Sequence, residues 1–354
     1  MTKKRKIEES IKKLLRKTVN KDKKLKEAQL LVDTSKLDID MNLVVNSKGK
    51  IKEDVLQPYY IASVGKIFTS VLISILKEKN KIEFDDKIVK YLEKEVTDKL
   101  HVYKGKDFSE EITISQLLNH TSGLNDHFYP LLEKVIEDSN FRISPKEVIK
   151  WSKRNLSPVS KPGEKFNYSD TNYHLLGLII ENLTGLSLAN AFKKYIFKPL
   201  GMKKTSMLHY SKPIDTYEIS IADFYYKDIK LNDYKGYADI DYAGGGIVST
   251  STDLLIFMKA LIKHQIIGKD TLEEMGDWQK QSLGLYYGYG IMRFKKIPLL
   301  MPYNFWGHSG ATGSFMYYQP DTEAFIIGNF NNFKYEKKSV RFIIKIISKL
   351  SKLN

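Results

Sequence analysis

The chain has 354 residues, a formal net charge of +15 and no cysteine. This length suits one large domain or two of ordinary size, and a content of 42% hydrophobic and 12% aromatic residues is that of a globular protein. The absence of cysteine excludes disulfides, thiol nucleophiles and cysteine-ligated metals.

Positive charge is concentrated near the two ends of the chain. The first 26 residues contain twelve Lys and Arg against three acidic residues, and the C-terminal stretch KYEKKSVRFIIKIISKLSKLN places lysines opposite an apolar helix face. Such blocks are usually solvated helix faces, although they also attract anionic surfaces. Because no aromatic and basic residues alternate in a stripe, we expect no nucleic-acid partner. Weak association of the basic N-terminal segment with an anionic membrane remains the alternative.

Neither a targeting segment nor a membrane span is predicted. The N-terminus MTKKRKIEESIKKLLRKTVN lacks the apolar run of roughly 7–15 residues that a signal peptide requires. No uninterrupted apolar stretch approaches the ~20 residues of a transmembrane helix. We therefore expect a cytoplasmic protein, whose oligomeric state the sequence leaves open.

The first two thirds of the chain are predicted to be mainly helical after two initial strands. Ser144, Pro145 and Glu147 have the spacing of a capping box with proline at the first helical position. In chain order, the predicted elements are a charged helix at 5–30, strands at 29–32 and 40–45, an apolar helix at 63–79, short helices capped by Ser115 and Ser144, and helices at 171–183 and 187–197.

Strand signals return after about residue 220 and a final amphipathic helix ends the chain. Strands at both ends with helices between them predict a mixed α/β (α+β) fold, in which both termini form one antiparallel sheet flanked by helices. We expect a discontinuous sheet domain of residues 1–59 and 220–354, and an inserted helical domain of residues 60–219. The active site would lie in the cleft between them.

Ser63 and Lys66 stand at the start of the predicted helix at 63–79. Residues three positions apart share a helix face, and the positive N-terminal end of a helix stabilises negative charge. The pair therefore fits a serine nucleophile with an amine that handles its proton. Taken alone, it fits better a helix cap followed by a solvated lysine.

Two distant segments offer partners for this pair. Tyr168, in NYSDTNY, precedes a predicted helix, and a tyrosine near a lysine can serve as a general base. His308 lies in WGHSGATGSF, where small residues allow a strand to approach a ligand closely. The alternatives are a packed aromatic ring and a structural histidine.

Several other chemistries are disfavoured. The seven histidines lack the spacing of metal ligands, and AGGGIVST lacks both the phosphate-loop and the dinucleotide-binding patterns. There is no Gly-x-Ser-x-Gly elbow of an α/β-hydrolase. We expect neither a metal nor a cofactor.

With these three segments in place, the chain resembles the serine β-lactamase-like family, which includes class C β-lactamases, DD-peptidases, D-aminopeptidases and esterases. SVGK matches its Ser-x-x-Lys box, YSD its Tyr-x-Asn box, and HSG the box that is Lys-Thr-Gly in many β-lactamases. Stretches such as ITISQLLNHTSGL and IFKPLGMKKTSM extend the resemblance over residues 60–332.

The resemblance implies a two-step acyl transfer to water without a metal or cofactor. Ser63 would be the acylated nucleophile, Lys66 would shuttle its proton, and Tyr168 would be the general base. The backbone N–H groups of Ser63 and Ala311 would form the oxyanion hole. The substrate-binding residues would be Asp170, His308, Ser309 and Gly310.

Two departures from the family pattern affect the expected substrate. Asp170 replaces the usual Asn, and an ionised Asp170 would favour a protonated Lys66 and attract a substrate ammonium. His308 replaces Lys and offers less charge to hold a substrate carboxylate. We therefore expect a serine hydrolase of small esters or D-amino-acid-containing peptides. The alternatives are a β-lactamase or D-Ala-D-Ala carboxypeptidase, and a non-hydrolysing protein that kept the fold.

The acyl pocket is not predictable in detail. Two tracts are candidates for it, TSGLNDHFYPLL and the residues around Tyr286–Tyr289, and for both we favour ordinary packing.

Overall fold

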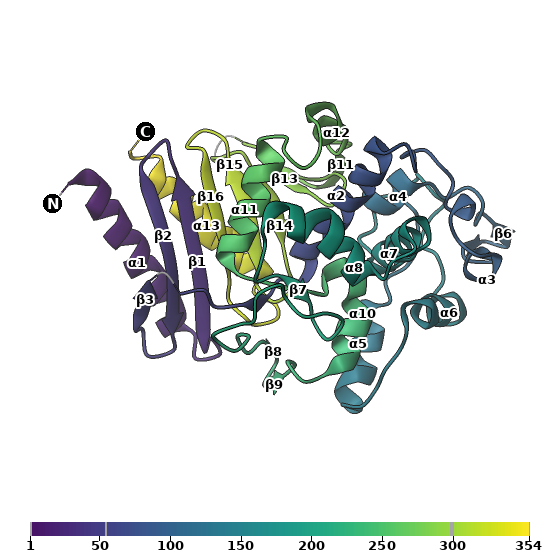
Figure 1. Ribbon diagram of the computed structural model, residues 1–354, viewed down its shortest axis with the longest axis horizontal. Coiled ribbons are helices and arrows are strands. Elements are labelled where there is room, and N and C mark those ends of the chain that lie inside the picture. Colours follow the sequence, from purple (N-terminus) through teal and green to yellow (C-terminus); the bar gives the residue numbers. More distant parts are fainter. Residues whose placement is uncertain (1, 54, 298–300, 354) are drawn as a thin grey trace.

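A nine-stranded antiparallel sheet organises the computed structural model, which describes residues 2–53, 55–297 and 301–353. The strand order is β11-β12-β13-β14-β15-β16-β1-β2-β3. N-terminal strand β1 pairs with C-terminal strand β16, with Leu31 opposite Ile327, so that the purple and yellow-green strands lie side by side in Figure 1. Both termini therefore build one sheet, and the predicted fold class is confirmed.

The strands of this sheet are short. They are β1 (Glu27–Thr34), β2 (Ile39–Asn46), β3 (Ile51–Glu53), β11 (Gln279–Ser282), β12 (Leu285–Tyr287), β13 (Met292–Phe294), β14 (Phe305–Ser309), β15 (Phe315–Gln319) and β16 (Ala324–Asn329). The smaller sheets comprise β4 (Tyr59–Tyr60), β10 (Ile247–Ser249) and β7 (Ser206–Met207), then β5 (Val102–Tyr103) with β6 (Lys106–Asp107), and β8 (Tyr225–Tyr226) with β9 (Ile229–Lys230).

The helices cover both faces of the large sheet and fill the other half of the molecule (Figure 1). They are α1 (Lys3–Lys21), α2 (Gly65–Glu78), α3 (Lys94–Thr97), α4 (Ile114–Leu118), α5 (Phe128–Glu137), α6 (Pro145–Asn155), α7 (Asp170–Thr184), α8 (Leu188–Phe192), α9 (Lys198–Leu200), α10 (Lys235–Gly245), α11 (Ser251–Ile262), α12 (Lys269–Glu274) and α13 (Glu336–Leu350). The 3-10 turns η1 (Ala62–Val64) and η2 (Ile88–Lys90) and the π-turn η3 (Lys193–Phe197) complete the set.

Alternation along the strands divides the core into two layers. Leu30 and Val32 of β1 pack beneath α1 and α13, whereas Leu31 points to the opposite face. Helix α1 buries Ile7, Ile11, Leu15 and Val19, which recur every four residues and form one stripe. The lysines of α1 and α13 are thereby left on the outside of the molecule.

Helix α2 runs through the centre of the other layer. Every residue from Gly65 to Leu76 is buried, because α7, α10 and α11 surround it. Such complete burial matches an apolar sequence with few breaks, and it fixes the start of α2 firmly in the molecule. The division into two domains stays a prediction.

Local signals predicted some boundaries and missed others. Ser144 caps α6 with a full capping box, as predicted. The prediction of a helix over 5–30 is wrong, because Asp22 is extended and β1 begins at Glu27. Ser115 does not cap α4; Thr113 does, since its side chain accepts from Gln116 N while Gln116 accepts from Thr113 N.

Helix α10 was not predicted, because AGGGIVST was interpreted as a strand signal. The glycines end α10, and only Ile247–Ser249 of this tract form a strand. The predicted helix at 187–197 is present as α8, η3 and α9 in succession. No single helix in the described part of the chain is long and apolar enough to cross a membrane; α7 and the segment Leu188–Leu200 reach that length and composition only as a pair bent by 72°.

Candidate active site

Ser63 lies in the 3-10 turn η1, directly before helix α2. The preceding Ala62 has a φ of 46°, in the left-handed region that residues with a side chain rarely adopt. Such local strain persists only where surrounding packing enforces it, and it clusters at functional sites. Ser63 does not cap α2, whose N-cap is Val64 without a side-chain hydrogen bond. The helix-cap interpretation is therefore wrong.

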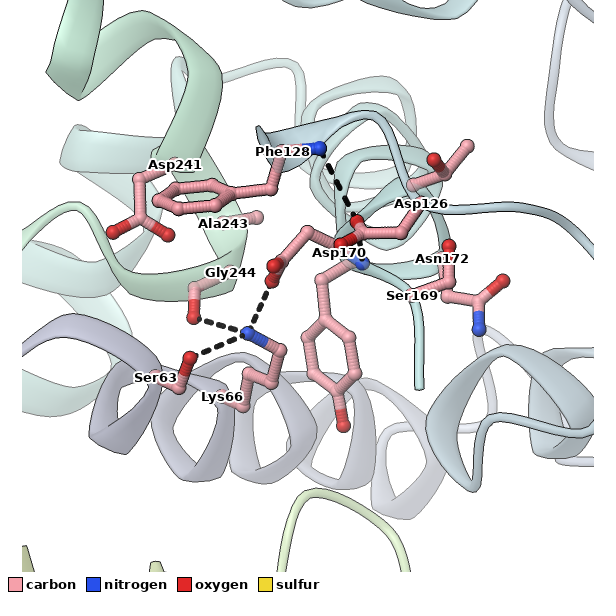
Figure 2. A network of polar contacts seen from close by, with 12 residues as sticks. Ser63, Lys66, Asp126, Phe128, Ser169, Asp170, Asn172, Asp241, Ala243 and Gly244 are labelled. Carbon is pink, nitrogen blue, oxygen red and sulfur yellow. Dashed lines mark hydrogen bonds and ion pairs between the residues drawn. The ribbon is translucent and has the colours of Figure 1, made fainter. Parts of the chain in front are cut away.

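Lys66 is completely buried, so the alternative of a solvated lysine is also wrong. Its Nζ donates to Ser63 Oγ at 3.1 Å and to the Gly244 carbonyl at 2.9 Å, and it forms an ion pair with Asp170 Oδ1 (Figure 2). These three acceptors use all three N–H bonds of an ammonium group. Lys66 thus links the nucleophile candidate to a carboxylate.

The glycines at the end of α10 allow this arrangement. A Cβ on Gly245 would lie 2.6 Å from the carbonyl carbon of Ala62, and one on Gly244 would lie 2.7 Å from Asp170 Oδ1. Tyr242 adopts a non-helical φ of 37° just before them. The glycine run in AGGGIVST therefore serves close backbone packing against η1 and Lys66, a role that its sequence pattern did not indicate.

Tyr168 precedes α7 and keeps its ring near Lys66, whose Nζ is 5.0 Å from the ring centroid. Burial and the neighbouring Asp170 carboxylate raise the pKa of Tyr168 well above its ordinary value, and an interaction with Ser63 lowers it only in part. Tyr168 is therefore a neutral phenol at rest.

His308 lies at the end of β14 and is buried, with 1% exposure. Its Nδ1 is 2.6 Å from the Ser309 carbonyl, and its Nε2 is 2.9 Å from the Tyr287 hydroxyl. Since a carbonyl only accepts, Nδ1 carries the proton and Nε2 accepts from Tyr287. Burial, together with Lys66, lowers the pKa of His308 to about 3, so the ring is neutral. The rings of Tyr168 and Tyr287 pack near it.

Ser309, Gly310 and Ala311 continue from this strand toward η1. The Ser309 hydroxyl contacts the Tyr317 hydroxyl at 2.8 Å. A Cβ on Gly310 would lie 2.8 Å from the Ala62 Cβ, so glycine lets this segment touch the turn that carries Ser63. Ala311 is half-buried and, like Ser63, lines the pocket between them.

Asp170 is the first residue of α7 and has two carboxyl neighbours that sequence reasoning missed. Its N–H donates to Asp126 Oδ1 at 2.9 Å, and Asp241 Oδ2 accepts from the Tyr60 hydroxyl at 2.6 Å. Figure 2 shows Asp126, Asp170 and Asp241 on the same side of α2 as Lys66. Burial, together with Asp170, raises the pKa of both Asp126 and Asp241 to about 7.

These elements enclose a pocket of about 180 Å³. It is lined by Ala62, Ser63, Asp126, Phe128, Tyr129, Tyr168, Asp170, Tyr237, Asp241, Gln281, Met292, His308, Ser309, Ala311 and Glu336. Of the predicted site residues, Lys66 and Gly310 lie behind this lining. Contrary to the favoured expectation of ordinary packing, residues of TSGLNDHFYPLL form one of its walls. Within the described ranges, no group of three or more His, Asp or Glu is arranged to hold a metal ion.

Comparison with known proteins places this site in a family. The family model described as Beta-lactamase matches residues 43–344. The chain belongs to the beta-lactamase family. The resemblance seen in the sequence is thus confirmed, and it is a resemblance to a family of serine hydrolases.

Among curated relatives, penicillin-binding protein 4* of Bacillus subtilis (strain 168) is 29% identical over 245 residues, which cover 66% of this chain and 51% of that protein. This beta-lactamase family member therefore spans about half the length of the curated relatives it matches.

Solved structures share the fold over nearly the whole chain. D-amino acid amidase from Ochrobactrum anthropi SV3, complexed with D-phenylalanine, superposes with a TM-score of 0.80 at 20% identity, covering 99% of this chain and 100% of that one. A D-stereospecific amidohydrolase from Streptomyces sp. has a TM-score of 0.75 at 23% identity, with 93% and 96% covered. At these identities the likeness establishes the fold.

Proposed function

We propose that the protein is a serine hydrolase that forms an acyl-enzyme on Ser63 and transfers the acyl group to water. One observation carries this proposal. The partly exposed Ser63 hydroxyl lines a small pocket and lies 3.1 Å from a buried lysine that is itself paired with a carboxylate. A nucleophile, a proton handler and a group that orients it are the parts that such catalysis needs.

The contacts of Lys66 support a proton relay to Asp170. An ammonium with three acceptors cannot take a further proton, so Lys66 passes one proton to Asp170 as it receives the Ser63 proton. Meanwhile Ser63 Oγ bonds to the substrate carbonyl carbon. In this scheme Asp170, through Lys66, takes the role of general base that the resemblance implies for Tyr168. When the bond to the leaving group breaks, the neutral Tyr168 donates its proton to that group and is reprotonated from Asp170 through Lys66. Water then attacks the acyl carbon and loses a proton to Asp170 through Tyr168 and Lys66. The bond between the acyl carbon and Ser63 Oγ breaks, and Ser63 recovers its proton from Asp170 through Lys66.

The rest of the site supports binding of the reacting carbonyl. The backbone N–H groups of Ser63 and Ala311 are proposed as the oxyanion hole, since both residues line the pocket. The segment His308–Gly310 is proposed to dock the substrate backbone. Neutral His308 supplies hydrogen bonding but no fixed positive charge.

We propose small esters or D-amino-acid-containing amides and peptides as substrates. The pocket volume of about 180 Å³ suits a small acyl group. Two of the structural neighbours are described as a D-amino acid amidase and a D-stereospecific amidohydrolase. A β-lactamase or a D-Ala-D-Ala carboxypeptidase is the second candidate, favoured by the penicillin-binding relative. The cytoplasmic location and weak association with anionic membranes stay predictions.

The test combines labelling with a substrate panel. A fluorophosphonate probe should label the wild-type protein and not Ser63→Ala. The protein should hydrolyse p-nitrophenyl acetate and D-alanine p-nitroanilide faster than a chromogenic cephalosporin. Fast turnover of the cephalosporin without esterase activity would contradict the substrate class. Absence of any Ser63 label would instead indicate a non-hydrolysing protein that kept the fold.

A further inference from the structure

The charged side chains that line the pocket are all acidic. They are Asp126, Asp170, Asp241 and Glu336, and none of the described residues of the lining is Lys or Arg. This contrasts with a formal net charge of +15 for the whole chain. Lys66 lies behind the lining and pairs with Asp170; its charge lowers the pKa of Asp126, Asp241 and Glu336 in part, but burial outweighs it.

Three of these carboxyl groups form no ion pair with any described residue, and only the more distant positive charge of Lys66, joined at Glu336 by that of Lys337, acts on them. Asp126 accepts from the backbone N–H groups of Asp170 and Phe128, and Asp241 accepts from the Tyr60 hydroxyl. Glu336, at the exposed start of α13, makes no side-chain ion pair with any described residue. Asp241 is buried and Asp126 is half-buried, and a carboxylate in such a position is costly without an ion-pair partner, so a structure that keeps both beside Ser63 suggests a missing cation.

A buried hydroxyl without a well-formed hydrogen bond lies beside them. Tyr237 is fully buried and lines the same pocket, one helical turn before Asp241 on α10. It lies near Tyr60 and Asp241, but its hydroxyl makes no hydrogen bond of proper geometry to any described residue. A hydroxyl oxygen can accept from an N–H donor, so Tyr237 and Asp241 together offer acceptors to a ligand with several N–H bonds.

We propose that Asp126, Asp241 and Tyr237, with Glu336 at the rim, form a subsite for an ammonium group on the acyl portion of the substrate. The substrate class is then small amides or esters of amino acids with a free amino group. This inference rests on the proposed hydrolase activity of Ser63. An organic ammonium is favoured over a metal ion, because the described carboxyl groups are not arranged as metal ligands.

The subsite also explains which substrates are excluded. A substrate recognised through a carboxylate, such as a β-lactam or a D-Ala-D-Ala peptide, would bring an anion among four carboxyl groups. His308 is neutral, and Lys66 is already paired with Asp170 behind the lining. Repulsion between these carboxyl groups and a substrate carboxylate disfavours such a ligand, as a steric clash would.

Two nearly isosteric substrates test the proposal. D-alanine p-nitroanilide and isobutyryl p-nitroanilide differ only in an ammonium group where the second has a methyl group. We expect kcat/KM to be at least about tenfold higher for the alanine compound, because an ion pair of partly buried groups is worth that much or more. The ratio should fall at least about threefold in Asp241→Asn and Glu336→Gln. It should stay unchanged in Glu133→Gln, which removes the same charge from the exposed face of α5.

A ratio between two substrates in one preparation does not depend on the folded fraction, so a less stable Asp241→Asn protein still gives a valid result. Equal or faster turnover of the isobutyryl compound would overturn the subsite while leaving the hydrolase intact. If neither anilide is cleaved, D-alaninamide should slow fluorophosphonate labelling of Ser63 more than isobutyramide does. Equal slowing would overturn the subsite. If the fluorophosphonate probe did not label Ser63 at all, the proposed function would be contradicted. The subsite, which rests on that function, would then fail as well.

Discussion

The outer helices and the pocket beside Ser63 carry charges of opposite sign and differ in how far those charges are exposed to solvent. Helices α1 and α13 expose their basic residues to solvent, among them Lys13, Lys17 and Lys345. The pocket gathers acidic groups beside Ser63, of which Asp170 and Asp241 are buried, Asp126 is half-buried and Glu336 is exposed. Solvated charges contribute little to stability, whereas each buried charge must be compensated. The formal net charge of +15 therefore describes the outside of the molecule and is a poor guide to what the site attracts.

The largest effect, on both stability and activity, is expected for the ion pair between Lys66 and Asp170. Asp170→Asn leaves the buried Lys66 ammonium without a carboxylate, which should destabilise the protein by about 3 kcal/mol. It also removes the proposed proton acceptor, so kcat should fall by about a hundredfold. Denaturant unfolding and p-nitrophenyl acetate hydrolysis measure the two effects. Glu93→Gln, which breaks the exposed Glu93–Lys146 pair, is the control, with less than about 1 kcal/mol expected.

An unchanged kcat in Asp170→Asn would contradict the relay, because the amide cannot take the proton. Asparagine is also the residue that the family usually has at this position. The substitution therefore separates a role in proton transfer from a role in holding the substrate, which an amide can still perform.

The second largest effect is expected on the free energy of unfolding and concerns Asp241, which forms no ion pair and whose pKa is raised to about 7. Its folded-state pKa exceeds the unfolded value of about 4, so wild-type stability is full below pH ~4 and falls as pH rises toward 7. Asp241→Asn avoids that loss while its amide oxygen keeps the Tyr60 bond. We expect a gain of about 1–3 kcal/mol at pH 8 and little or none at pH 4, measured by unfolding at both pH values. A variant that is less stable at pH 8 would show that the carboxylate is already compensated.

The third effect is on substrate choice. As pH rises from 5 to 7, Asp126 and Asp241 begin to lose protons while the substrate amine, with an ordinary pKa of about 8, stays charged, so the preference for the ammonium substrate should increase about threefold. The other ionisable groups that face these two carboxyls are Lys66, Asp170, Glu336, Tyr60, Tyr129, Tyr168, Tyr237, His127 and His174. Burial lowers the pKa of both histidines and raises that of all four tyrosines, so these six groups stay neutral over this range. The ratio of the two anilide kcat/KM values checks this, and a flat profile would argue against these two carboxyls as the subsite.

The smallest effect is expected for charge changes on the solvent-exposed face of α1. Lys13→Glu with Lys17→Glu changes the net charge by four units on α1, yet the anilide ratio should not change and stability should shift by less than about 0.5 kcal/mol. Binding of the wild-type protein and of this double variant to vesicles of neutral and of anionic lipid measures whether this face attracts an anionic membrane. A change in the anilide ratio would mean that long-range charge, rather than the pocket, selects the substrate.

Sequence predicted the parts of this molecule that depend on local patterns. The capping box at Ser144 and the short apolar run of β1 are encoded within a few residues, and Ser63, Lys66 and Tyr168 stand in recognisable boxes. Asp126 and Asp241 were not predictable in this way. Each is an isolated acidic residue in the sequence, and its surroundings depend on segments more than 40 residues away. Asp126, for example, contacts Asp170. Helix α10 was missed because glycine has a low helix propensity and packing overrides it here.

The most direct measurement is mass spectrometry of the protein quenched during turnover of D-alanine p-nitroanilide. The account predicts an alanyl adduct on the peptide that contains Ser63, absent in Ser63→Ala and weaker from the isobutyryl compound under the same conditions. An adduct on another residue, or an equally abundant isobutyryl adduct on Ser63, would contradict it.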